Sequence, residues 1–288
     1  MGVDSSRAQF SILDSYEIGS TQAKSVTSVR GRLAKCISEW EGINAPGFIL
    51  EVIREGYKIP FVSLPPPKHS DNNLSAVKER DFVSEAVLDL LKMNCIEELD
   101  EAPDIVNPLS VSTQSSGKKR LILDLRHVNL YFYKQKFKCE DLKVALSIIS
   151  RGYSLFKFDL KSGYHHVEIF PEHRKFLAFR WGFGDGVIRY FQFAVLPFGL
   201  PYLFTKLFKP VIKMWRSNGI PIVVFLDDGL GGGATELTAK IHSLKVHSDL
   251  IRFGFIVNLA KSQWDPSHVI VWLGCVIDTI RGTIAATD

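Results

Sequence analysis

Cysteine is scarce in this chain and is never paired at the spacing of a metal or redox motif. The 288 residues contain four cysteines, far apart and with no Cys-x-x-Cys pair. Small disulfide-bonded domains and structural zinc sites both depend on such clusters, so the sequence excludes both classes. We expect the four to be reduced residues of a hydrophobic core; they are Cys36, Cys95, Cys139 and Cys275.

Long apolar runs are also missing. No stretch approaches the roughly 18 residues that a membrane-spanning helix needs. The N-terminus has no charged start followed by an apolar segment of the kind that directs secretion. The composition is nevertheless 46% hydrophobic, which is enough for a full core. We therefore expect an intracellular protein without membrane contact, folded as one or two closely packed subdomains.

Positive charge is concentrated in one segment. The formal net charge is only +4, yet residues 118–138 hold seven Lys and Arg side chains against one acidic residue, Asp124. The rest of the chain is therefore slightly acidic, and the positive field is local, as a phosphate-binding surface requires. A solvated charged surface without a ligand is the alternative interpretation.

Prolines and hydrophobic periodicity divide the chain. Residues 1–30, rich in Ser, Thr and Gln, are expected to form a mobile lead-in, and the three prolines after Leu64 indicate an extended linker. Strands that alternate with helices indicate an α+β fold in which a sheet is covered on one side. The predicted helices span about 75–94, 202–216 and 235–254, and Ser75 is the candidate cap of the first. The predicted strands span 155–158, 222–226 and 269–277.

Two of these strands end in aspartate. Asp159 follows one, and Asp227-Asp228-Gly229 follows the other. Alone, the second sequence is typical of a tight hairpin turn, because Asp and Gly tolerate positive φ angles. If both strand ends meet at one edge of a shared sheet, three carboxylates crowd together. Two unit charges ~4 Å apart repel by about 4 kcal/mol at an effective dielectric of 20, so the pattern predicts bound cations.

Oxygen ligands of this kind suit Mg²⁺ rather than zinc, with Mn²⁺ as a substitute. Two such ions, ~3.5–4 Å apart, can activate a primer 3′-hydroxyl and stabilise a pyrophosphate leaving group together, which is nucleotidyl transfer. A second metal-site hypothesis, from His165, His166 and Glu168, is disfavoured because these residues would alternate faces of one strand-like stretch.

Six blocks of the sequence, in this order along the chain, resemble those of retroelement reverse transcriptases over about residues 45–288. The resemblance is closest to long-terminal-repeat-type and DIRS-like elements, and it implies an RNA-directed DNA polymerase. The two catalytic blocks are Phe158-Asp159-Leu160-Lys161-Ser162-Gly163-Tyr164 and Phe225-Leu226-Asp227-Asp228; the other four are Arg120-Leu-Ile-Leu-Asp124, Leu196-Pro-Phe-Gly199, Asn258-Leu-Ala-Lys261 and Trp272-Leu-Gly274.

The resemblance implies a role for each matching residue. Asp159, Asp227 and Asp228 would hold two metal ions, and Lys261 would protonate the leaving pyrophosphate. Tyr164 would block a ribose 2′-hydroxyl, which implies DNA synthesis; an ordinary core tyrosine is the competing interpretation. The incoming nucleotide would also be bound by Arg120, Lys118, Lys119, Phe198, Gly199 and Leu226, and the primer would be gripped by Trp272, Leu273 and Gly274.

The same resemblance implies the fingers and palm of a right-hand polymerase, with the palm built as a ferredoxin-like or RRM-like antiparallel sheet backed by helices. The implied partners are an RNA or DNA template, a primer strand and deoxynucleoside triphosphates. The implied division is a lead-in at 1–30, an N-terminal extension with the Pro-rich linker at 31–75, fingers at 76–150 and 171–197, and palm at 151–170 and 198–288.

Two features depart from the family pattern. Relatives carry a few more small or polar residues between the positions of Leu200 and Pro201, and their loss would shift the start of the following helix by nearly one turn. The chain also ends soon after Gly274, without a thumb or ribonuclease H sequence, so we expect a fragment of a longer polyprotein. Two alternatives stay open: a decayed, inactive nucleic-acid-binding fragment of the same family, and an RNA-dependent RNA polymerase.

Overall fold

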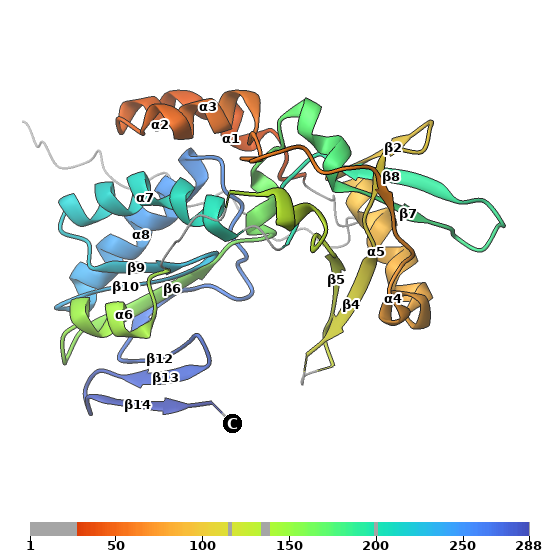
Figure 1. Cartoon of the computed structure of the whole chain (residues 1–288). Coiled ribbons are helices and arrows are strands. Elements are labelled where there is room, and N and C mark those ends of the chain that lie inside the picture. Colours follow the sequence, from red (N-terminus) through yellow and green to blue (C-terminus); the bar gives the residue numbers. More distant parts are fainter. Residues whose placement is uncertain (1–27, 115–116, 134–138, 199–200, 288) are drawn as a thin grey trace, which may run out of the picture.

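The computed structural model describes residues 28–114, 117–133, 139–198 and 201–287. Its centre is a four-stranded antiparallel sheet in the order β11-β6-β10-β9 (Figure 1). The strands run over Gln263–Ser267 (β11), Ser154–Asp159 (β6), Asp228–Gly233 (β10) and Ile222–Phe225 (β9). The strands predicted at 155–158 and 222–226 are therefore confirmed.

The two faces of β6 bury different side chains. Phe156 and Phe158 belong to the main hydrophobic core, whereas Leu155 belongs to a second, smaller one. Because successive side chains of a strand point to opposite faces, Lys157 and Asp159 share the face of Leu155. That face carries the polar residues of the site.

Two long helices cover the main-core face of the sheet (Figure 1). They are α7 (Pro201–Ser217) and α8 (Glu236–Arg252), close to the predicted 202–216 and 235–254. Thr235 caps α8, since its side-chain oxygen accepts a hydrogen bond from the Thr238 amide. The fully buried Trp215 of α7 packs edge-on against Phe158 at 6.2 Å between ring centroids.

A second antiparallel sheet lies on the other side of the central one, next to α6 (Leu142–Ile148) (Figure 1). It consists of β12 (Val269–Trp272), β13 (Cys275–Asp278) and β14 (Thr283–Ala286). Ile270, Trp272 and Ile277 pack with Leu155 in the smaller core. The strand-like stretch predicted at 269–277 is thus a hairpin.

The remaining strands form a separate lobe (Figure 1). It contains the three-stranded sheet β2-β8-β7, the hairpin β4-β5 and the parallel pair β1-β3. Their bounds are Lys68–His69 (β1), Ile96–Leu99 (β2), Ile105–Val106 (β3), Leu109–Thr113 (β4), Lys119–Leu123 (β5), Ala178–Trp181 (β7) and Arg189–Phe193 (β8); the 3-10 helices η1 (Val128–Tyr131) and η3 (Pro171–Leu177) belong to the same part.

The helix predicted at 75–94 is two helices. They are α4 (Leu74–Lys78) and α5 (Arg80–Lys92), separated at Glu79, whose φ of −103° and ψ of 40° leave the helical region. Ser75 does not cap α4: its hydroxyl accepts a hydrogen bond from the Val111 amide of β4. The Ser75 hydroxyl therefore links α4 to β4.

The N-terminal helices pack over the end of α8. They are α1 (Arg32–Lys35), α2 (Ile37–Gly42) and α3 (Gly47–Glu55). Trp40 of α2 lies 5.1 Å from the ring of Phe253, and its indole donates a hydrogen bond to the Phe253 carbonyl. Val29, at the end of the predicted lead-in, is only 1% exposed; residues 1–27 lie outside the described residues.

All four cysteines are free thiols, but only Cys95 is fully buried. The expectation that all four belong to the core is wrong for the other three, which are half-buried. Burial raises the pKa of the Cys95 thiol to about 12. Within the described residues, no helix is both long and apolar enough to cross a bilayer.

Candidate active site

Three aspartates come together at one edge of the central sheet. Asp159, the last residue of β6, is the register partner of Asp228, the first residue of β10. Directly opposed residues in an antiparallel pair point to the same face, with Cβ atoms about 4.5–5.5 Å apart. Asp227 precedes Asp228, and its carbonyl accepts a hydrogen bond from the Leu160 amide at 3.0 Å. Residues far apart in the sequence thus form one acidic edge.

The turn that presents Asp227 has an unusual backbone. Phe225 pairs with Asp228, so Leu226 and Asp227 form a two-residue hairpin loop. Leu226 has a φ of +56°, in the left-handed region that hairpin loops usually give to Gly, Asn or Asp. A leucine there costs about 1–2 kcal/mol. The Leu226 side chain is partly buried against the main core, which offsets that strain.

The segment after α8 holds the Asp159 carboxylate in place. Lys261 donates a hydrogen bond from Nζ to Oδ2 at 3.0 Å, and Asn258 donates from Nδ2 to Oδ1 at 2.9 Å. The Asp159 amide donates to the Ser262 hydroxyl at 3.1 Å. The Asp159 residue is 8% exposed. Sequence reasoning assigned a role to Lys261 and missed Asn258 and Ser262, although Asn258 lies in the same short block.

Crowding disfavours the charged forms of two of the carboxylates. Burial, followed by the negative charges of Asp227 and Asp159, raises the pKa of Asp228 to about 7. Burial and the charge of Asp159 also raise the pKa of Asp227, although Lys261 and Arg120 oppose this. Oxygen-only donors that repel one another fit a hard divalent cation. In the described part of the chain, however, no three ligating side chains already converge on one point.

The raised pKa of Asp228 predicts a pH-dependent stability. The folded-state pKa of about 7 exceeds the ordinary value of 3.8. Asp228 therefore makes its full contribution to the free energy of unfolding below pH 3.8, and this contribution is lost as the pH rises through 7. Asp228→Asn should raise the melting temperature of the metal-free protein by about 2–4 °C at pH 8, which corresponds to roughly 1 kcal/mol after allowance for solvent screening.

The rise in melting temperature caused by Asp228→Asn should be smaller at pH 5 than at pH 8. At pH 8, Mg²⁺ should raise the melting temperature of the original protein more than that of the variant. Thermal melts in a chelator and in Mg²⁺ measure both effects. The exposed Asp100 supplies the matched control, Asp100→Asn, which should show neither. Equal gains for Asp228→Asn at pH 5 and pH 8 would contradict the argument.

Tyr164 lies on the 3-10 helix η2 (Gly163–His166), beside the acidic edge. Its ring centroid is 5.5 Å from that of Phe198 and 5.2 Å from that of Phe204 on α7. The residue is 7% exposed, and burial and the charge of Asp227 raise the pKa of its phenol to about 12, so the phenol is neutral at physiological pH. Gly163 is required here, because a Cβ atom would lie 2.8 Å from Asp227 Cβ.

The prediction that His165 and His166 lie on a strand is wrong. Both lie on η2, and both are buried. Burial lowers the pKa of each ring to about 4. His166 accepts a hydrogen bond from the Ile256 amide at its Nε2, which makes it a structural link. Glu168 pairs with Arg30 and Arg174 instead of a metal. The disfavoured second metal site is therefore not assembled.

The predicted nucleotide-binding cations of the β4-β5 hairpin point in different directions. Lys119 pairs with Glu79 at 2.6 Å, whereas Lys118 and Arg120 are exposed. The positive charge of Arg120 opposes the rise in the pKa of Asp227, so this side chain lies within electrostatic range of the acidic edge. Gly199 and Leu200, where the sequence departs from the family pattern, lie outside the described residues.

The predicted primer-grip residues form the β12-β13 hairpin loop. Trp272 pairs with Cys275, and the loop residues Leu273 and Gly274 have φ angles of +48° and +72°. Two consecutive positive φ angles are typical of a type I′ hairpin turn. The loop borders a cleft of about 290 Å³ that also contacts the acidic edge; its lining includes Asp159, Asp228, Lys261, Trp272 and Leu273.

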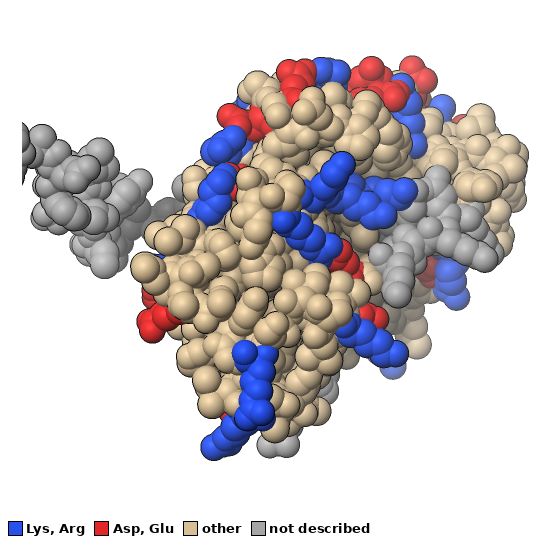
Figure 2. Space-filling view, turned by 90° about the vertical axis from the view of Figure 1, so that its left-hand side faces the viewer, with Lys and Arg blue, Asp and Glu red and all other residues tan. Residues whose placement is uncertain are grey.

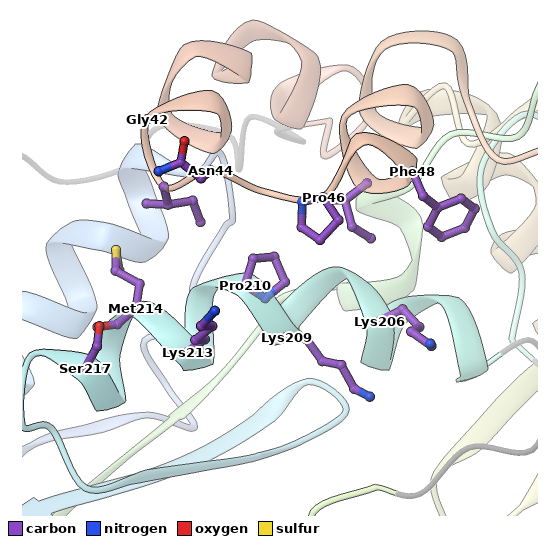
Figure 3. A pocket seen from close by; sticks show the side chains of 12 residues that line it. Gly42, Asn44, Pro46, Phe48, Lys206, Lys209, Pro210, Lys213, Met214 and Ser217 are labelled. Carbon is purple, nitrogen blue, oxygen red and sulfur yellow. The ribbon is translucent and has the colours of Figure 1, made fainter.

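A groove of about 900 Å³ lies elsewhere, between α7 and the segment from Gly42 to Ile49 (Figure 3). Lys206, Lys209 and Lys213 line it from successive turns of α7, and Lys and Arg side chains gather on this face of the molecule in Figure 2. None of the predicted site residues contributes to the groove. The two cavities are therefore distinct.

Comparisons with known proteins agree with this geometry. Residues 113–277, more than half of the chain, match the family model "Reverse transcriptase (RNA-dependent DNA polymerase)". The chain is 30% identical over 157 residues to a putative enzymatic polyprotein of Cassava vein mosaic virus, and 32% identical over 178 residues to a genome polyprotein of Petunia vein clearing virus. A Tf2-3 transposon polyprotein of Schizosaccharomyces pombe is 22% identical over 225 residues.

The matches cover 53%, 60% and 77% of this chain, but only 22%, 8% and 16% of those polyproteins. Among solved structures, the foamy viral protease-reverse transcriptase in complex with RNA/DNA hybrid is similar with a TM-score of 0.64 at 21% identity, over 78% of this chain and 29% of that one. The complex of the same protein with dsDNA gives 0.63 at 20% identity, over 86% and 55%. These likenesses confirm the predicted polymerase fold. Together with the family match, they show that the chain belongs to the reverse transcriptase (RNA-dependent DNA polymerase) family and is a reverse transcriptase domain of the kind found in retroelement polyproteins.

Proposed function

We propose that this chain is a polymerase core that extends a primer by two-metal nucleotidyl transfer. The observation that carries the proposal is the pairing of Asp159 with Asp228 across β6 and β10, with Asp227 in the adjoining turn. Asp159, Asp227 and Asp228 would hold two Mg²⁺ ions, or Mn²⁺ in their place. When bound, these ions activate the primer 3′-hydroxyl and stabilise the leaving pyrophosphate.

The chain's own residues orient the reactants. Lys261 lies at the acidic edge with its ammonium on Asp159, where it can donate a proton to a pyrophosphate oxygen. Arg120 supplies a planar guanidinium for bidentate contact with the triphosphate, and Lys118 adds a second exposed cation. Lys119 has a smaller part, because Glu79 engages its ammonium.

The nucleotide would lie against Tyr164 and Phe198, whose rings are in contact, with Gly199 and Leu226 completing its surroundings. The Trp272–Gly274 loop would hold the primer terminus. Template and primer would lie between the palm, at 151–170 and 198–288, and the fingers, at 76–150 and 171–197. A longer polyprotein of the long-terminal-repeat or DIRS-like type would supply the thumb and ribonuclease H.

A catalytically inactive nucleic-acid-binding fragment is the second candidate. The observation that favours it is the shortened sequence at Leu200-Pro201, next to Phe198, whose ring contacts Tyr164. Such a fragment would bind a primer annealed to its template with strong salt dependence but would not extend it. Insertion of three small residues after Leu200 would then restore extension.

Primer extension on an RNA template with Mg²⁺ tests the proposal and separates it from RNA synthesis. The chain should incorporate deoxynucleotides and discriminate against ribonucleotides, because the Tyr164 ring would exclude a 2′-hydroxyl. Tyr164→Ala should reduce that discrimination by about 10-fold or more, roughly 1.4 kcal/mol. Tyr164→Phe is the control, since it keeps the ring. A preference of the unaltered chain for ribonucleotides would contradict the assignment as a DNA polymerase.

A further inference from the structure

A lysine of β6 reaches across to the second sheet. Lys157 lies two residues before Asp159, on the same face of the strand. Its Nζ atom donates a hydrogen bond to the Val271 carbonyl of β12 at 2.8 Å. Lys157, Asp159, Val271 and Trp272 all line the 290 Å³ cleft beside the acidic edge. The strand that carries Asp159 is therefore tied directly to the strand that leads into the Trp272–Gly274 loop.

The two sheets are also attached at their other end, where only His268 separates β11 from β12. The Thr279 hydroxyl donates to the Tyr153 carbonyl at 2.6 Å, and the Gly152 amide donates to the Thr279 carbonyl at 2.9 Å. Thr279 is 4% exposed, so this attachment is well shielded. Across the described residues, the bond from Lys157 is the one hydrogen bond that joins β6 to β12.

Among the described residues, the loop is anchored by polar contacts only outside the central sheet, where the Gly274 carbonyl accepts hydrogen bonds from the amide and the hydroxyl of Thr287. The indole nitrogen of Trp272 is buried and without a hydrogen-bond partner, so apolar packing alone holds that ring. Apolar contacts are non-directional and permit sliding, whereas a hydrogen bond fixes a distance. The bond from Lys157 is thus the directional restraint between the loop and the acidic edge.

We propose that Lys157 is a positioning residue that fixes the Trp272–Gly274 loop relative to Asp159, and thereby places the primer 3′-hydroxyl at the carboxylates. This inference rests on the proposed function of that loop as the primer grip. The alternative is that Lys157 binds a primer phosphate directly. The two roles differ in whether Lys157 acts before any nucleic acid is present.

Hydrogen exchange of the nucleic-acid-free chain tests the link without reference to activity. Lys157→Met keeps the length of the side chain and removes the donor, and it should raise the exchange rate of amides in residues 269–276 by about 10-fold or more. Lys157→Arg should restore protection. The exposed Lys143 of α6 gives the control Lys143→Met, with no change. Unchanged exchange in a folded Lys157→Met protein overturns the proposal; Lys157→Gln provides a second neutral variant if the first does not fold.

Single-turnover extension tests the consequence. Lys157→Met should reduce the rate at saturating primer, template and nucleotide by about 10-fold, while the salt dependence of binding stays the same. Loss of a phosphate contact would instead lower the salt slope by about one unit and leave the saturated rate intact, which overturns the positioning role. If the unaltered chain extends no primer, the proposed function fails, whereas the exchange experiment still decides whether Lys157 holds the loop.

Discussion

Asp159→Asn is expected to reduce primer extension by at least about 10³-fold, equivalent to roughly 4 kcal/mol of transition-state stabilisation. The amide has no charge, so it cannot balance the divalent cations that the acidic edge would hold. The amide also has one acceptor oxygen where the carboxylate has two, and the carboxylate uses one oxygen for Lys261 and the other for Asn258. Steady-state extension on an RNA template with Mg²⁺ measures the loss.

Binding and folding should survive this change, because removal of a charge from a crowded acidic edge relieves repulsion. The affinity for a primer annealed to its template should therefore be retained or slightly raised. Asp265→Asn, at a surface position 92% exposed, is the matched control and should extend normally. Extension by Asp159→Asn at the original rate would show that this carboxylate does not serve catalysis.

Gly229→Ala should destabilise the chain by about 3 kcal/mol through overpacking, which lowers the melting temperature by roughly 6–12 °C. An added Cβ atom would lie 2.1 Å from Cε1 of Phe158. That ring has no free space to enter, since it stacks on Trp264 at 6.2 Å and packs edge-on against Trp215. Thermal or urea unfolding measures the difference.

Gly47→Ala is the control for this substitution. No atom lies within 4 Å of the added Cβ, and Gly47 starts helix α3, where alanine is favourable. Its melting temperature should stay the same or rise. A Gly229→Ala protein of unchanged stability would mean that β6 and β10 are farther apart than their register implies.

The acidic edge was predictable because two strong local patterns met. Asp159 and Asp228 each border a run of β-branched or aromatic residues, and strands of that kind pair within a sheet. Their register, however, depends on how Gly229 and Gly231 accommodate the rings of Phe158 and Phe156, which no propensity describes. The resemblance to the family implied the roles of the aspartates, and the register of β6 and β10 brings Asp159 next to Asp228.

The errors arose where tertiary contacts override a local pattern. The apolar spacing of 75–94 is helical throughout, yet Glu79 breaks the helix, and the Ser75 hydroxyl bonds to β4 instead of capping it. His165 and His166 were predicted to alternate faces of a strand-like stretch, but they lie on a 3-10 helix and both are buried. Short segments are the hardest to predict, since a few long-range contacts outweigh their intrinsic preference.

Lys157 was overlooked for a related reason. In the run Leu155-Phe156-Lys157-Phe158, a lysine reads as the solvent-facing residue of an alternating strand. The acceptor of its hydrogen bond is a backbone carbonyl more than one hundred positions away, and backbone carbonyls leave no trace in a sequence pattern. The sequence likewise did not reveal that Lys119 pairs with Glu79. Adjacent side chains of a strand point to opposite faces, so Lys119 and Arg120 of β5 have different surroundings.

Four of the six residues of β10 are glycines, so this strand has almost no side chains of its own. The aromatic rings of the neighbouring β6 occupy that space, and a Cβ on Gly231 would lie 2.5 Å from Phe156. The backbone that carries Asp159 and Asp228 is therefore packed tightly against aromatic rings. When a cation binds, these two carboxylates must adjust by rotation of their own short side chains, because the tightly packed backbone cannot move.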